Sequence, residues 1–338
     1  MKAKLDDVAL EAGVSKTTVS RVLNNRGYLS DKTKQKVYAA VKKLNYHPNE
    51  VARQLFENRT KLIGLVFPTT ANPFFGEIIE KIEANLFLEG YKALICNSMN
   101  NPQKEREYLQ MLISNQVDGI IVGAHNTGIA EYETVGLPIV SIDRFLSNQI
   151  PIISSDNYEG GRLATEYLFN KGARHIIHTN GPIEKNAPTM LRKKAYEDVM
   201  NEHGFTPKTY SLDLNLPDEE KNKTITRIFE ENPEVDGIFS SNDVDAMSVI
   251  NIAKQYQRFV PNNLQVIGYD GTHMLRNIYP ELPTIVQPIQ EMAQLSVSML
   301  LKLINGDEVD KNVIFPISLY KPELCICIKL IGQIISFT

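Results

Sequence analysis

The feature that most constrains the fold is an alternation that begins at residue 62 and continues through most of the chain. Short runs rich in β-branched and other apolar residues lie at 62–67, 93–96, 119–122, 139–142, 175–178, 237–240 and 266–267. Segments of helical periodicity, such as 74–89 and 163–171, separate them. This alternation predicts an α/β fold, because a crossover helix usually joins two parallel strands. Ligand-binding residues are then expected on loops that follow the carboxyl ends of strands.

The charges are divided unevenly along the chain. Residues 1–60 contain 12 Lys and Arg against 6 Asp and Glu, whereas the other residues contain 24 against 34. The pattern predicts a small basic N-terminal unit attached to an acidic body, which favours a nucleic-acid-binding head. A solvated basic helix surface is the alternative explanation.

The N-terminal unit is predicted to be all-α. A first helix spans 5–12, with Asp6 as its cap and Gly13 as its end. Ser15 caps a second helix, and a third helix begins at Ser30. The second helix has one apolar face, and its opposite face carries Lys16, Thr17, Ser20 and Arg21.

Two helices joined by a short glycine-containing turn fit a helix-turn-helix, whose second helix enters the major groove of DNA. Arg21 is then a candidate for a guanine edge, Thr17 for bases or a thymine methyl group, and Lys16 for bases or phosphate. Ser20 lies on the same exposed face. A generic helical hairpin remains open on pattern alone.

Four motifs in this region closely resemble the lactose/galactose-repressor (LacI/GalR) family: LDDVA at 5–9, AGVS at 12–15, TVSRVLN at 18–24 and LNYHPN at 44–49. The resemblance implies a DNA-binding domain over 1–59 that ends in a hinge helix at about 49–58. It also implies a homodimer on a pseudo-palindromic, double-stranded operator. In the family, the leucine that matches Leu55 wedges between base pairs in the minor groove.

The same resemblance implies a two-lobed core over 60–338 with a periplasmic-binding-protein-like fold of parallel sheets flanked by helices. The N-lobe is expected at about 62–157 and 286–316, and the C-lobe at about 158–285 and 317–338. The residues after 321 have no family counterpart that we identify, and they fit either an extra strand, an altered reading frame or an exposed apolar segment.

Candidate effector contacts lie on the predicted loops between strands and helices. Carboxylates and a guanidinium can grip ring hydroxyl groups through paired hydrogen bonds, and an aromatic ring can cover an apolar sugar face. The candidates are Asn72, Phe74, Asp143, Arg192, Asn242 and Asp270, of which the last four match effector positions of the family. Burial at a helix start is the alternative for Phe74, and a strand-end cap or a surface ion pair for the charged residues. Asp156 and Asn157 are assigned to the hinge first and to the ligand second.

These patterns lead to one function hypothesis: a cytoplasmic, dimeric repressor of a sugar-utilisation operon, regulated by a sugar or sugar phosphate. The stretches 96–102 and 179–182 are most similar to sucrose-operon repressors. The alternative is a global catabolite regulator whose corepressor is a phosphorylated carrier protein. An enzyme is disfavoured because the sequence has no glycine-rich phosphate loop after a strand and no G-x-S-x-G motif. We expect no membrane span, because no stretch approaches the roughly 18 uncharged apolar residues that a span needs. We also expect no cofactor, and no metal, since the three cysteines lack partners at zinc spacing.

Overall fold

The computed structural model describes residues 3–24, 27–47, 59–99, 101–124, 126, 128–134, 136–181, 188–213 and 216–322. The chain divides into two compact units, Met1–Thr60 and Lys61–Thr338, which are considered separately. The predicted hinge helix with Leu55, and the chain after residue 322, lie outside the described residues.

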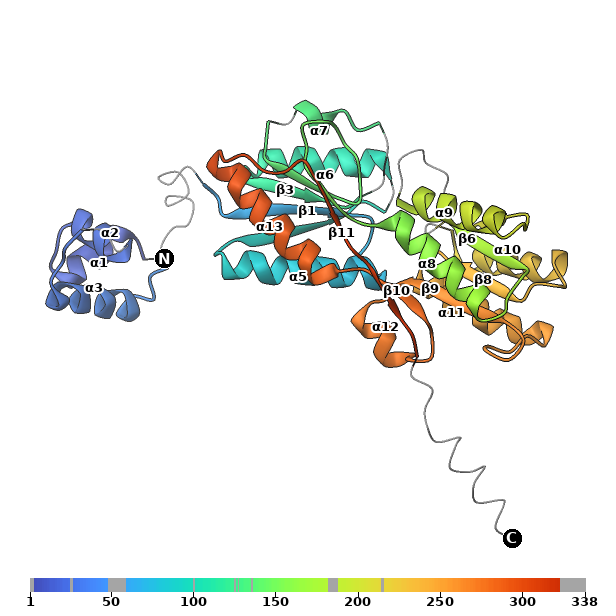
Figure 1. The fold of residues 1–338 in the computed structure, drawn as a ribbon. Helices are drawn as coiled ribbons and strands as arrows, with labels where there is room; N and C mark the ends of the chain where they lie inside the picture. Colours follow the sequence, from blue (N-terminus) through green and yellow to red (C-terminus); the bar gives the residue numbers. More distant parts are fainter. Residues whose placement is uncertain are drawn as a thin grey trace, which may run out of the picture. The chain divides into compact units, whose positions relative to one another are not determined.

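The first unit contains three helices, α1 (Leu5–Ala12), α2 (Lys16–Leu23) and α3 (Asp31–Lys43) (Figure 1). Their apolar faces meet in one small core that includes Val8, Ala12, Val19, Val22, Val37, Ala40 and Tyr46. The Ser15 side chain caps α2 as predicted, the Ser30 side chain caps α3, which was predicted to start at this residue, and Gly13 ends α1 with a left-handed backbone. The three predicted helices are therefore confirmed.

The predicted cap of α1 is wrong. Lys4 is the N-cap residue, and the Asp7 carboxylate accepts a hydrogen bond of 2.7 Å from the Lys4 backbone N–H. Asp6 lies inside the first turn and pairs with Lys16 instead, at 2.9 Å. Asp7 stands at the third helical position, so its carboxylate reaches back to the backbone of the N-cap residue and marks Lys4 as the residue before the first turn.

The N-lobe of the second unit is an all-parallel sheet in the order β11-β5-β4-β3-β1-β2. Its strands are β1 (Leu62–Phe67), β2 (Lys92–Asn97), β3 (Gly119–Val122), β4 (Ile139–Ile142), β5 (Ile152–Ser155) and β11 (Asn312–Phe315). Helices α5 (Pro73–Leu88) and α13 (Ile289–Asn305) cover one face (Figure 1). Helices α6 (Pro102–Ser114) and α7 (Glu131–Thr134) cover the other. Both faces are thus buried, as a parallel sheet requires.

The C-lobe repeats this plan in the order β12-β10-β9-β8-β6-β7, with an antiparallel edge strand β12 (Ser318–Tyr320). The other strands are β6 (Ile176–Asn180), β7 (Lys208–Ser211), β8 (Gly237–Ser240), β9 (Gln265–Asp270) and β10 (Thr284–Val286). Helices α8 (Asn157–Asn170) and α9 (Pro188–Glu202) pack on one face, and α10 (Asp218–Glu231) and α11 (Asp243–Ala253) on the other. A 3₁₀ turn (Lys254–Tyr256) and α12 (His273–Ile278) complete the lobe.

Within the described chain, the backbone passes between the two sheets after β5, after β10 and after β11. These crossings bring the ends of β5 and β10 and the start of α8 to the junction of the lobes. The predicted fold class, a helical head followed by a two-lobed α/β core, is confirmed. No helix in the part that the structure describes is long and apolar enough to span a membrane.

Candidate functional site

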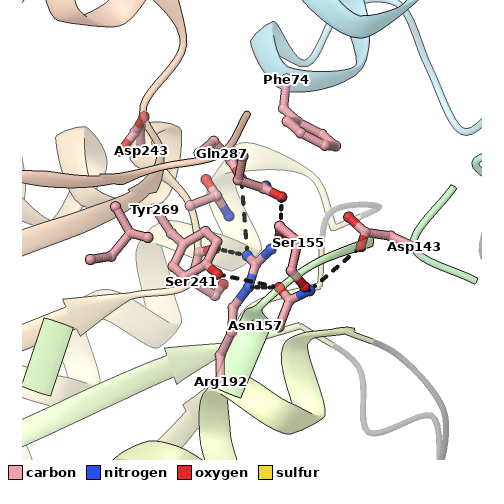
Figure 2. Close-up of polar contacts among 12 residues, drawn as sticks. Phe74, Asp143, Ser155, Asn157, Arg192, Ser241, Asp243, Tyr269 and Gln287 are labelled. Atoms are coloured by element: carbon pink, nitrogen blue, oxygen red, sulfur yellow. Dashed lines mark hydrogen bonds and ion pairs between the residues drawn. The ribbon is translucent and has the colours of Figure 1, made fainter. Parts of the chain in front are cut away.

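A buried polar cluster at the junction of the lobes is centred on Arg192, which lies on α9 (Figure 2). The Arg192 Nε donates to Asn157 Oδ1 at 2.8 Å, and Nη1 donates to the Ser241 carbonyl at 2.7 Å. The guanidinium also stacks on the Tyr269 ring, 3.5 Å from its centroid. Arg192 is thereby fixed by groups from α8, from the end of β8 and from β9.

Asp270 and Gln287 connect this arginine to the N-lobe. The Gln287 amide donates to Asp270 Oδ1 at 2.8 Å, and its oxygen accepts from Ser155 Oγ at 2.7 Å. Arg192 Nη1 lies 4.0 Å from Asp270 Oδ1. Because Ser155 ends an N-lobe strand, one ion pair and two hydrogen bonds connect Arg192 to the other side of the junction.

Asp143 approaches the same cluster from the end of β4. The Asn157 amide donates to its carboxylate at 3.5 Å. Asp143 and Asp270 both have positive φ, +53° and +105°, a backbone region that residues other than glycine rarely adopt. Such strained residues concentrate at functional sites, because the surrounding structure must hold them in place.

Burial dominates the electrostatics of these carboxylates. Desolvation raises the pKa of Asp143 to about 6 and that of Asp243 to about 7, and it raises the pKa of Asp270 well above its usual range. In all three cases the positive charge of Arg192 opposes the shift. We define the Arg192 cluster as Asp143, Ser155, Asn157, Arg192, Tyr269, Asp270 and Gln287.

Asn242 and Asp243 have local hydrogen-bond partners. Asn242 caps α11, since its Oδ1 accepts from the Asp245 backbone at 2.8 Å and its amide donates to the Asp245 carboxylate at 2.6 Å. Asp243 holds the loop after β9 by accepting from the Gly271 N–H at 2.8 Å and from the Thr284 hydroxyl at 2.5 Å. The polar atoms of both side chains are therefore engaged locally, and of the two only Asp243 also interacts electrostatically with Arg192.

Asn72 and Phe74 stand at the start of α5. The Asn72 Oδ1 accepts from the Phe74 backbone N–H at 2.9 Å and so caps the helix. Phe74 and Phe75 are both buried and pack edge to face, with ring centroids 5.4 Å apart. In Figure 2 the Phe74 ring extends from its helix toward the cluster.

The candidate DNA-reading face lies on α2. Lys16, Thr17 and Arg21 are exposed and Ser20 is partly exposed, whereas Val19 on the opposite face is fully buried. Lys16 is paired with Asp6, and Ser20 Oγ accepts a weak hydrogen bond of 3.4 Å from the Asn24 amide. The Arg21 guanidinium lies so close to Gly27 that a Cβ there would collide with it. A row of polar side chains is thus presented on one side of a well-packed helix.

Sequence reasoning missed Gln287 and Tyr269 and placed Asn157 mainly in the hinge. Ligand-binding residues are expected at the carboxyl ends of strands, which is why Asp270 at the end of β9 was a candidate. Gln287 directly follows β10, so the same expectation applies to it. Tyr269 carried no such signal, because an aromatic residue in a buried strand is ordinarily core. No group of three or more metal-binding side chains occurs among the described residues.

Comparisons with known proteins agree with this arrangement. Residues 4–49 match the model of bacterial regulatory proteins of the lacI family, and residues 63–308 match a periplasmic binding protein domain. The chain is 48% identical to the sucrose operon repressor of Pediococcus pentosaceus, over 95% of this chain and 99% of that one. It is therefore a bacterial regulatory protein with a DNA-binding head and a periplasmic-binding-like body.

Two solved structures are also similar. A lac repressor dimer bound to operator and an anti-inducer has a TM-score of 0.83 at 27% identity, covering 95% of this chain and 98% of that one. A LacI-type regulator of Alkaliphilus metalliredigens complexed with D-xylulofuranose has a TM-score of 0.71 at 32% identity, covering 78% and 98%. The chain belongs to the LacI family, and its relatives are named transcriptional repressors, not enzymes.

Proposed function

We propose that the chain represses a sugar-utilisation operon in the cytoplasm, that it binds a pseudo-palindromic operator as a homodimer, and that a small neutral sugar between its lobes controls this binding. The name of the Pediococcus relative supports the operon type, and the lac repressor dimer supports the assembly on DNA. The xylulofuranose complex supports a sugar in the body of such a protein.

The observation that carries the proposal is the Arg192 cluster. A guanidinium, buried carboxylates and a glutamine amide from both lobes converge there. Charged donors and acceptors form strong hydrogen bonds with sugar hydroxyl groups, and the neighbouring Phe74 provides an apolar surface for a ring.

The charge of the cluster favours a neutral sugar over a sugar phosphate. Asp143, Asp243 and Asp270 place three carboxyl groups around the Arg192 guanidinium, and burial raises the pKa of each of them and so favours its uncharged form. A phosphate would bring further negative charge into a buried site that already disfavours ionised carboxylates, because desolvation penalises charged groups.

The DNA-binding half of the proposal rests on α2 and on the family resemblance of the hinge. Lys16, Thr17, Ser20 and Arg21 form the proposed reading face, and Leu55 is the proposed minor-groove wedge. Base-edge contacts from such a helix give sequence specificity, whereas phosphate contacts only position the protein.

The proposed coupling between DNA binding and sugar binding depends on the position of the Arg192 cluster at the junction of the lobes. A sugar that binds one arrangement of the lobes better than another shifts their populations, and thereby alters operator affinity. A phosphorylated carrier protein acting as corepressor is the second candidate, and its co-purification with the repressor on operator DNA would favour it.

The proposal is tested by calorimetry of the full-length chain with sucrose, fructose, glucose, ribose and their phosphates. We expect one neutral sugar to bind the wild type. Asp270→Asn exchanges one acceptor for a donor, so one hydrogen bond is mismatched, and Arg192→Ala removes the opposing donors. Both variants should lose at least about tenfold in sugar affinity and keep the operator affinity measured without sugar.

Arg162→Ala is the matched control, because Arg162 lies on α8 and pairs with Glu202 at 2.9 Å outside the Arg192 cluster. It should bind sugar like the wild type. Normal sugar binding by Asp270→Asn and Arg192→Ala would show that the site is elsewhere, and tighter binding of a phosphate would reverse the assignment of a neutral sugar.

A further inference from the structure

A second buried polar cluster lies in the N-lobe, and the proposed function does not use it. Glu105 of α6 is fully buried, and its carboxylate accepts from Tyr132 Oη at 2.7 Å and from the Asn126 amide at 2.5 Å. Arg144 Nη1 completes it with an ion pair to Glu105 at 3.1 Å. We call these four residues the Glu105 cluster.

Arg144 directly follows Asp143, so the two clusters meet at one peptide. The Arg144 side chain also donates to the Ala124 carbonyl at 2.6 Å, and its own carbonyl accepts from Ser141 Oγ at 2.5 Å. The Asp143 backbone N–H donates to the Ile153 carbonyl at 2.9 Å. The turn after β4 is therefore held on both sides of Asp143.

This turn needs such support because Asp143 has a φ of +53°. A non-glycine residue persists in this region only where the surrounding contacts over-determine its backbone. Arg144 is 8% exposed, so its side chain leaves the turn for the interior of the N-lobe, while the Asp143 carboxylate points toward Asn157 (Figure 2). The Arg144 side chain therefore anchors the residue next to that carboxylate.

We infer that Glu105 and Arg144 form a positioning pair that fixes the Asp143 carboxylate for the effector; this inference rests on the proposed function. Neither residue contacts the Arg192 cluster through its own side chain in the hydrogen bonds of the described structure. A buried ion pair pays a large desolvation cost and stabilises a fold poorly compared with apolar residues of similar volume. Its presence here agrees with a positional role at a strained turn.

The test is a double-mutant cycle in the full-length chain. The pair is replaced together, as Glu105→Gln with Arg144→Gln, so that no single buried charge is left unpaired. The same pair of substitutions is made in wild type and in Asp143→Asn, and calorimetry measures the affinity of the bound sugar from the panel above. Melting curves confirm folding of each variant.

If the pair acts through Asp143, its replacement weakens sugar binding by about tenfold in the wild-type background and by less than about twofold in the Asp143→Asn background. Equal losses in the two backgrounds would overturn the inference, because they would show a general structural effect. Arg106→Gln is the control, since Arg106 of α6 pairs with Glu131 of α7 at 3.2 Å on the partly exposed side of the same two helices. It should leave sugar affinity unchanged.

Hydrogen exchange gives a second readout that needs no sugar. Replacing the pair should remove protection of the Asp143 amide, whereas strands far from the turn keep theirs. Unchanged protection at Asp143 would contradict the positioning role. If no sugar in the panel binds the wild type, the proposed function fails, and this exchange measurement still decides whether the pair holds the turn.

Discussion

At the scale of single residues, the Arg192 cluster depends on one arginine that is held from several directions. Arg192, Asp143 and Asp270 are predictable from sequence, because each stands at the end of a strand or near the start of a helix, where ligand-binding residues of an α/β fold are expected. Tyr269 is not, since its stacking on Arg192 at 3.5 Å depends on the packing of β9 against α9. A long-range contact of this kind leaves no local pattern in the chain.

Arg21→Ala tests the reading face of α2. The variant should lose about 1–3 kcal/mol of binding free energy on the cognate operator and much less on random DNA, because base-edge contacts carry the specificity. Fluorescence anisotropy with both DNAs measures this. Lys43→Ala is the control, because Lys43 is bonded to Glu11 at 2.7 Å within the head and lies outside α2. An equal loss on random DNA would show that Arg21 contacts only phosphate.

His178 predicts a pH dependence of stability. It is fully buried between Phe239 and Tyr196, and burial lowers its pKa to about 3 from the ordinary 6.5. Below pH 6.5 the unfolded chain binds a proton that the folded chain does not, so the stability that depends on a neutral His178 is lost as pH falls toward 3.

Relative to His178→Gln, the wild type should therefore lose about 2 kcal/mol of unfolding free energy between pH 7 and pH 5. Urea denaturation at the two pH values measures the difference. The same gap between wild type and variant at both values would contradict a buried neutral histidine.

At the scale of elements, helices and strands follow the sequence closely because their apolar periodicity is strong. The predicted strand at 266–267 extends over Gln265–Asp270, and the predicted strand at 175–178 is observed at Ile176–Asn180. The last residues of these two strands, Asp270 and Asn180, are polar, so the apolar pattern ends before the strand itself ends. The N-cap of α1 was mispredicted because Lys4 is not a typical capping residue.

Gly161 sets the distance between α8 and α9. A Cβ on Gly161 would lie 2.6 Å from the Arg192 backbone oxygen, which cannot move without shifting α9. Gly161→Ala should cost about 1–3 kcal/mol of stability through overpacking and should weaken sugar binding by displacing Arg192.

Thermal melting and calorimetry check both effects. Gly181→Ala is the comparison, because Thr189 Cγ2, at 4.0 Å, is the one atom of the described residues that a Cβ there would meet. If Gly161→Ala keeps the stability and the sugar affinity of the wild type, α8 and α9 can accommodate a Cβ between them, and their contact does not fix Arg192.

At the scale of the whole molecule, the uneven charge and the alternating pattern predicted a basic helical head and an α/β body. The alternation alone does not say that the body has two sheets, because a crossover within one sheet and a crossover between sheets look alike along the chain. The family resemblance supplied the two lobes, and the strand order confirms them. The contacts that lead from Arg192 through Asp270 and Gln287 to Ser155 show how the two lobes meet.

The central claim is that one chain reads an operator and senses a neutral sugar. Its most direct test is the anisotropy of a labelled operator bound to the full-length wild type and titrated with sucrose, fructose, glucose, ribose and their phosphates. One neutral sugar should change operator affinity by about tenfold or more, within the usual range of allosteric coupling, and leave binding to random DNA unchanged. Operator affinity that is unaffected by every compound, or equal to that for random DNA, would contradict the claim.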